Sequence, residues 1–151
     1  MQYNITCKIE SISLEELLIY MRFQANEAFP SLKDKTKLLA FATKLHENAE
    51  FCLCRDEGKL VGMIAYYANG QGVDFAYIPH VYVSPNYRKI GLFSRMLNTI
   101  EKYVQEKGFS EIRLEVEKEN VIAQSVYLRN GFTQYKTASP NSMYMSKIFK
   151  D

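Results

Sequence analysis

One segment, residues 74–117, constrains the fold more than any other part of this 151-residue chain. Hydrophobic patterning predicts a strand over 74–83, a helix over 92–104 that ends at Lys107-Gly108, and a strand over 112–116. A strand, a helix and a strand in this order form a right-handed crossover whose two strands pair in parallel. The chain therefore contains a parallel strand pair.

The rest of the chain adds strands that pair by hairpins. The same patterning predicts strands at 3–9, 51–55, 59–67, 132–136 and 143–149, and helices at 14–28, 38–45 and 120–128. Ser13 is the expected N-cap of the first helix, with Glu16 at capping-box spacing. A turn at 56–58 joins two of the strands in a hairpin. We expect an α/β fold with a mixed sheet of about seven strands flanked by about four helices.

Length and composition narrow the class of protein. A chain of 151 residues without repeats or linkers predicts a single domain over 1–151. The net charge is only +2 and the charges are interspersed, so we expect no nucleic-acid partner. No apolar stretch is long enough to span a membrane, and Met1 to Ile9 do not resemble a signal peptide. These features predict a cytoplasmic protein without a membrane partner.

The cysteines predict no metal site and no disulfide. Cys7, Cys52 and Cys54 are odd in number and form no CxxC pair. A metal would need further ligands, and His46 and His80 are the only histidines. We expect ordinary reduced thiols in the core, which agrees with a cytoplasmic location.

The strand-to-helix turn at residues 84–94 favours an anion. The first N–H groups of a helix lack partners within it, and together with the helix dipole they bind groups such as a pyrophosphate. Gly91 permits close backbone approach, and Arg88 and Lys89 add positive charge. A solvated basic turn before an amphipathic helix is the alternative. GxGxxG and P-loop motifs are absent, which counts against common nucleotide sites.

A second segment presents a polar helix face. Asn120, Ala123 and Tyr127 are three and four residues apart, so they share one side of a helix. Core packing would favour a large aliphatic residue at the first position. Small and polar residues that end in a tyrosine suit a groove for a thin polar ligand instead.

Together these segments resemble the GCN5-related N-acetyltransferase (GNAT) family. Its loop reads Gln or Arg, two residues, Gly, one residue, then Gly or Ala, and here Arg88, Gly91 and Phe93 hold those positions. Phe93 departs from the pattern, and its ring either crowds the phosphates or faces the core. The flanking family motifs are matched by Val81, Val83, Pro85, Asn120, Ala123, Tyr127, Gly131 and Phe132. The match is close over 74–136 and loose elsewhere.

The resemblance implies a GNAT fold, acetyl-CoA as co-substrate without a metal, and direct transfer to a small-molecule or peptide amine in a ternary complex. Family members splay the strand before the loop from its parallel neighbour, and Pro79, which cannot donate a ladder hydrogen bond, marks that place here. The implied cofactor-binding residues are Val81, Tyr82, Val83, Arg88, Lys89, Ile90, Gly91, Leu92, Phe93, Ser94, Asn120, Ala123 and Tyr127.

The resemblance also implies catalytic roles. Tyr127 matches the family's general acid, since a phenol with a pKa of about 10 can protonate a thiolate. A backbone N–H near Tyr82 would stabilise the oxyanion. The usual carboxylate position holds Tyr77, so His80, with an ordinary pKa of about 6.5, is the expected base. Packing roles for Tyr127 and His80 are the alternatives, and Glu27, Asp74 or water could replace His80.

The sequence also gives expectations for the acceptor site and the oligomeric state. We expect the acceptor site between residues 28–36 and 139–142, lined by Tyr66, Tyr67 and Tyr77. Either a monomer or a homodimer fits. Two other functions stay open: a catalytically idle acyl-CoA-binding sensor or regulatory module, and an acyltransferase with another acyl donor or a hydroxyl acceptor.

Overall fold

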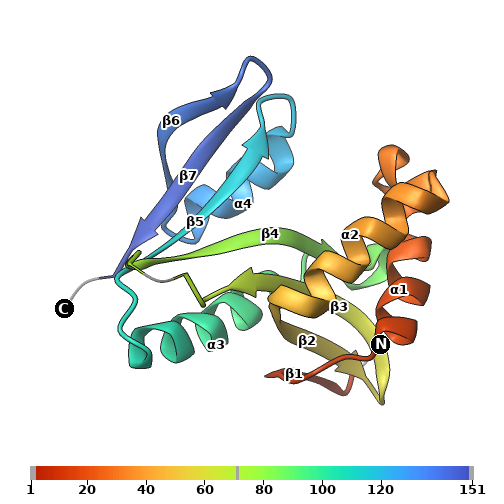
Figure 1. Cartoon of the computed structure of the whole chain (residues 1–151). Coiled ribbons are helices and arrows are strands. Elements are labelled where there is room, and N and C mark those ends of the chain that lie inside the picture. Colours follow the sequence, from red (N-terminus) through yellow and green to blue (C-terminus); the bar gives the residue numbers. More distant parts are fainter. Residues whose placement is uncertain (1–2, 71, 150–151) are drawn as a thin grey trace. The chain divides into compact units, whose positions relative to one another are not determined.

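The fold was obtained as a computed structural model, which describes residues 3–70 and 72–149 (Figure 1). The elements follow in the order β1 (Ile5–Ile9), α1 (Leu14–Glu27), η1 (Pro30–Lys33), α2 (Lys35–Asn48), β2 (Glu50–Asp56), β3 (Lys59–Tyr67), β4 (Phe75–Val83), η2 (Pro85–Tyr87), α3 (Leu92–Glu106), β5 (Glu111–Glu117), α4 (Val121–Arg129), β6 (Thr133–Ser139) and β7 (Ser142–Ile148). This order confirms the predicted order of strands and helices. The short turns η1 and η2 were not predicted.

The strands form one mixed sheet in the order β1-β2-β3-β4-β5-β7-β6. β4 and β5 pair in parallel, as the crossover predicts, while β1–β2, β5–β7 and β6–β7 pair antiparallel. The predicted fold class is therefore confirmed.

Side-chain caps fix where the helices begin. Ser13 Oγ accepts from the Glu16 N–H at 3.0 Å, which confirms the predicted N-cap of α1. Asp34 Oδ1 accepts from the Thr36 and Lys37 N–H groups at the start of α2. Such caps satisfy N–H donors that have no partner within the helix.

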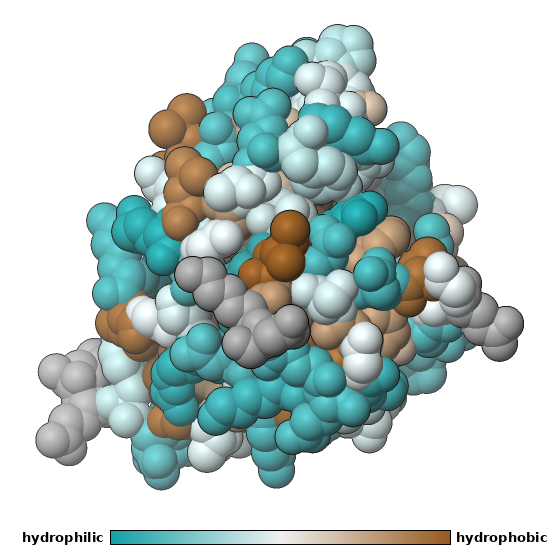
Figure 2. Space-filling model, turned by 90° about the vertical axis from the view of Figure 1, so that its left-hand side faces the viewer, coloured by the Kyte–Doolittle hydropathy of each residue, from teal (hydrophilic) through white to brown (hydrophobic). Residues whose placement is uncertain are grey.

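The chain divides into two compact units, which are described separately. Unit 1 comprises Met1–Ala65 and His80–Thr99, and unit 2 comprises Tyr66–Pro79 and Ile100–Asp151. The single-domain assignment stays a prediction. Each unit has its own fully buried side chains: Leu17, Met21, Leu45, Leu53, Met63, Ile64, Met96 and Leu97 in unit 1, and Tyr66, Ile100, Ile112 and Phe132 in unit 2. On the face shown in Figure 2, hydrophobic residues form small separate groups among hydrophilic ones.

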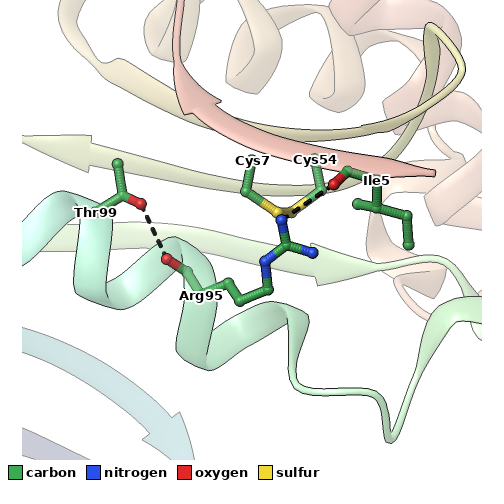
Figure 3. The surroundings of a disulfide bond; sticks show 5 residues. All are labelled: Ile5, Cys7, Cys54, Arg95 and Thr99. Atoms are coloured by element: carbon green, nitrogen blue, oxygen red, sulfur yellow. Dashed lines mark hydrogen bonds between the residues drawn. A yellow bond between two sulfur atoms is a disulfide. The ribbon is translucent and has the colours of Figure 1, made fainter. Parts of the chain in front are cut away.

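The cysteines correct the expectation of three reduced thiols. Cys7 and Cys54 form a disulfide, while Cys52 is free and buried (Figure 3). The physical reason is the register of β1 against β2, which sets Cys7 directly opposite Cys54. Arg95 of α3 extends beside this bond and donates from Nη2 to the Ile5 carbonyl at 3.1 Å.

No helix among the described residues is long and apolar enough to cross a membrane. The cytoplasmic location stays a prediction.

Candidate functional site

The turn between β4 and α3, in unit 1, carries the predicted anion site. Lys89 and Gly91 have φ angles of 66° and 83°, both in the left-handed region. The Arg95 N–H donates to the Gly91 carbonyl at 3.1 Å, so the helical bonds begin directly after this turn. Left-handed residues before a helix start direct backbone N–H groups toward a common anion. The turn therefore has two left-handed residues, Lys89 and Gly91, directly before the start of α3.

Gly91 follows the family pattern of this loop, whereas Phe93 departs from it. A Cβ added at Gly91 would meet no atom within 4 Å, so its left-handed φ, rather than crowding, favours glycine there. Phe93 is 8% exposed and belongs to the core. Of the two expected positions for the Phe93 ring, against the phosphates or in the core, the structure shows the core.

Arg88 is held by protein groups. Its Nε donates to the Val83 carbonyl at 2.9 Å, and its Nη2 donates to Oε1 of Glu27 at 2.5 Å. Tyr82 Oη also donates to Oε1 of Glu27, at 2.7 Å. The bonds from Tyr82 and then Arg88 hold the pKa of Glu27 below its usual value. Arg88 thereby links the end of α1 to the loop. Arg88 and Lys89 are both exposed, and Arg88 is paired with Glu27.

His80 lies inside unit 1. It is 6% exposed, and its Nε2–H donates to Oε1 of Gln24 at 2.5 Å. The Gln24 amide in turn contacts the sulfur of Met63, and the rings of Phe29 and Phe41 lie 5.1 and 5.5 Å from the imidazole. Burial lowers the pKa of His80 to about 4. At neutral pH the ring is therefore neutral and hydrogen-bonded to Gln24.

The parallel pairing of β4 with β5, in unit 2, ends directly before Pro79, where the sequence predicts that the two strands separate. β4 pairs with β5 from Phe75 opposite Glu111 to Ile78 opposite Leu114. The next residue of β4 is Pro79, which has no N–H to offer a neighbour. β5 continues to Glu117 and pairs with β7 along its whole length, from Glu111 to Glu117.

Helix α4, also in unit 2, carries the second motif. Asn120 caps it, with Oδ1 accepting from the Ala123 N–H at 3.1 Å. Ala123 is half-buried, and so is Tyr127, whose ring lies 5.9 Å from that of Phe132. Burial raises the pKa of Tyr127 to about 12. The phenol therefore keeps its proton throughout the neutral range.

The predicted acceptor-site tyrosines differ in exposure. Tyr66 is fully buried, whereas Tyr67 and Tyr77 are half-buried. Burial, and secondarily the charge of Glu115, raises the pKa of Tyr77 to about 12. Glu115 was not predicted as a site residue, because a charged residue that alternates with apolar ones is typical of a solvated strand face.

No group of three or more His, Cys, Asp or Glu side chains within residues 3–70 and 72–149 is arranged to hold a metal ion.

Comparisons with known proteins identify similar sequences and a matching family. The model of the acetyltransferase (GNAT) family matches residues 14–132. N-alpha-acetyltransferase 20 of Dictyostelium discoideum is 30% identical over 83 residues, or 53% of this chain and 47% of that protein. An uncharacterized N-acetyltransferase of Methanocaldococcus jannaschii is 27% identical over 145 residues, or 87% of this chain and 64% of that protein. The chain thus spans less than two thirds of the length of these relatives.

A solved structure shows the same fold. The PaiA N-acetyltransferase of Thermoplasma acidophilum, in complex with coenzyme A, aligns with a TM-score of 0.73 at 22% identity over 95% of this chain and 99% of that chain. The family model covers most of the chain, including the strand, the loop and the helices described above. The chain therefore belongs to the acetyltransferase (GNAT) family.

Proposed function

We propose that this chain is an acetyl-CoA-dependent N-acetyltransferase that transfers the acetyl group directly to an amine in a ternary complex. The observation that carries the proposal is the turn before α3, where Lys89 and Gly91 adopt left-handed φ angles at a helix start within a GNAT sequence. The coenzyme A bound to the PaiA protein of the same fold supports this cofactor. We assign the pyrophosphate to the loop from Arg88 to Ser94.

The remaining cofactor contacts follow the family pattern. We assign Val81 to Val83 of β4 to the pantetheine arm, with backbone groups of the strand as its partners. Asn120, Ala123 and Tyr127 of α4 are assigned to the same cofactor from their match to the family motif. Because Glu27 engages the Arg88 guanidinium, we assign phosphate binding to backbone N–H groups and Lys89, with Arg88 as a positioning residue.

Acyl transfer places three demands on the protein. A backbone N–H of β4 near Tyr82 would stabilise the carbonyl oxygen as it becomes an oxyanion. Tyr127 would protonate the departing thiolate, and its raised pKa means that it is protonated at neutral pH. The third demand is a base for the amine. A pKa of about 4 makes His80 a weak proton acceptor, which favours another route for this proton.

Thermal shift measurements test the cofactor site. Acetyl-CoA should raise the melting temperature of the wild type, because a ligand that binds the folded state stabilises it. Gly91→Glu should abolish this shift by placing bulk and negative charge at the phosphates. Gly108→Glu is the matched control, since Gly108 is also exposed, has a φ of 96° and has no atom within 4 Å of an added Cβ.

Two outcomes would reject the assignment of the loop. One is a wild type that shows no shift at millimolar acetyl-CoA. The other is an equal loss of the shift in Gly91→Glu and Gly108→Glu. A shift without thiol release for any amine would instead favour an acyl-CoA-binding sensor. Tyr77 at the usual carboxylate position is the observation that keeps this second function in view.

A further inference from the structure

The base for the amine is the open part of the proposed function, and the following inference rests on that function. Three side chains expected from the sequence are already engaged. His80 is buried against Gln24, and Glu27 accepts from Tyr82 and Arg88. Asp74 precedes β4 and accepts from Ser110 Oγ at 3.2 Å. The proton of the amine therefore passes either to water or to a side chain that the sequence did not single out.

One face of the unit 2 sheet presents such a group. Register sets Tyr77 beside Arg113 across the β4–β5 pair, and Glu115 opposite Tyr144 across the β5–β7 pair. Alternate residues of a strand share a face, so Arg113 and Glu115 lie on the same side of β5. Tyr77, Glu115 and Tyr144 therefore project from one face at the carboxyl end of the parallel pair. Ligands of open α/β sheets bind at such strand ends.

The charges on this face leave Glu115 available. Arg113 forms a two-bond pair with Glu111, at 2.9 and 3.1 Å, and its guanidinium lies 3.8 Å from the centre of the Phe75 ring. These two charges cancel locally. Lys136 lies 5.4 Å from the centre of the Tyr144 ring. Among the described residues of unit 2, no cationic nitrogen lies within ion-pair distance of Glu115.

A buried serine orients the Glu115 carboxylate. Ser142 is 5% exposed and donates from Oγ to Oε2 of Glu115 at 2.6 Å. A hydroxyl has one proton, and Ser142 donates it to Glu115. In the 2.8 Å contact between Ser139 Oγ and Ser142 Oγ, Ser139 is therefore the donor. Glu115 itself is exposed. Glu115 is therefore an oriented carboxylate that is accessible from solvent. Such a group can bind an ammonium group and accept a proton from it.

Tyr77 supports this arrangement without acting as a base. Its pKa of about 12 keeps the hydroxyl protonated, and among neighbouring charges Glu115 raises that pKa most. Register also sets Glu115 two residues beyond Arg113, the partner of Tyr77, so Tyr77 and Glu115 are diagonal neighbours on one face of the β4–β5 pair. A protonated phenol beside a carboxylate can donate a hydrogen bond but cannot accept a proton from an amine at neutral pH.

We propose that Glu115 holds the acceptor amine between Tyr77 and Tyr144 and accepts its proton during transfer. As nitrogen bonds to the acetyl carbonyl carbon, one N–H proton passes to Glu115, the C–S bond breaks, and the thiolate takes a proton from Tyr127. Exchange with water then restores Glu115 and Tyr127. Each turnover forms one amide and one thiol, and no further reactant is needed.

The test compares Glu115→Gln with Glu117→Gln. Glutamine keeps the size of the side chain and can accept from Ser142, but it carries no charge and is not a base. Glu117 is the matched control, because it lies two residues further on the same face of β5 and is also exposed. We expect Glu115→Gln to lower kcat/KM for a primary amine about 100-fold or more. Glu117→Gln should stay within about threefold of wild type.

Two further readouts separate this role from a structural one. The acetyl-CoA-induced thermal shift of Glu115→Gln should equal that of the wild type, since fold and cofactor site are intact. Added formate should restore part of the activity of Glu115→Ala, because a small carboxylate can occupy the vacated space. Activity of Glu115→Gln within threefold of wild type, or an equal loss in Glu117→Gln, would overturn the proposal. Wild-type binding of acetyl-CoA without transfer to any amine would reject the proposed function itself.

Discussion

Mild acid should destabilise this protein through His80. The imidazole has an ordinary pKa of about 6.5 in an unfolded chain and a pKa of about 4 in the fold, because burial disfavours its charged form. The unfolded state therefore binds the proton more tightly. The neutral ring contributes its full stability above pH 6.5, and this contribution falls as the pH drops toward 4.

The size of the effect follows from these two pKa values. Between pH 7 and pH 5 the loss from this one group is about 2 kcal/mol, and it approaches about 3 kcal/mol at pH 4. A domain of this size has a free energy of unfolding of about 5–15 kcal/mol, so the loss is measurable.

Urea unfolding at pH 7 and pH 5 provides the assay, with wild type beside His80→Gln. A glutamine amide can donate to Oε1 of Gln24 in place of the imidazole, yet it does not titrate. Carboxylates that change protonation contribute to both proteins and cancel in the comparison. Wild type should lose about 2 kcal/mol more than His80→Gln between these pH values. An equal loss in both would refute the burial argument.

Two other predictions concern catalysis and the disulfide. Tyr127→Phe keeps the ring but removes its proton, so kcat should fall about 100-fold while the Kd of acetyl-CoA stays the same; a kcat within threefold of wild type would assign Tyr127 to packing alone. Reduction of Cys7–Cys54, which are 47 residues apart, should lower the free energy of unfolding by about 2–4 kcal/mol, as measured by urea unfolding with and without dithiothreitol. Cys7→Ser should unfold at the same urea concentration under both conditions, and a reductant effect that persists in this variant would place its origin elsewhere.

Much of the fold could be predicted because its signals are local. The helical spacing from Leu92 to Val104, between two strands, predicts the crossover, and the parallel pairing of β4 with β5 confirms it. Ser13 predicts the start of α1 because an N-cap acts on N–H groups two or three residues away. Such features depend on neighbours in the sequence, which the chain itself displays.

The missed features depend on register between distant segments. Cys7 meets Cys54 because β1 pairs with β2 at one particular alignment, and no local pattern specifies it. The low pKa of His80 likewise comes from its burial, and the rings of Phe29 and Phe41 that lie against it are distant in the sequence. Glu115 differs from a solvated strand residue only when Tyr77, Tyr144 and Ser142 are seen on the same face.

Product analysis tests the central claim most directly. Wild-type protein is incubated with acetyl-CoA and a panel of primary amines, and free thiol is quantified while the amide is identified by mass spectrometry. We expect at least one amine to give thiol and acetylated product in a one-to-one ratio, with Gly91→Glu at background and Gly108→Glu near wild type. Absence of amide for every amine, or thiol release that is equal with and without amine, would contradict the assignment of this chain as an N-acetyltransferase.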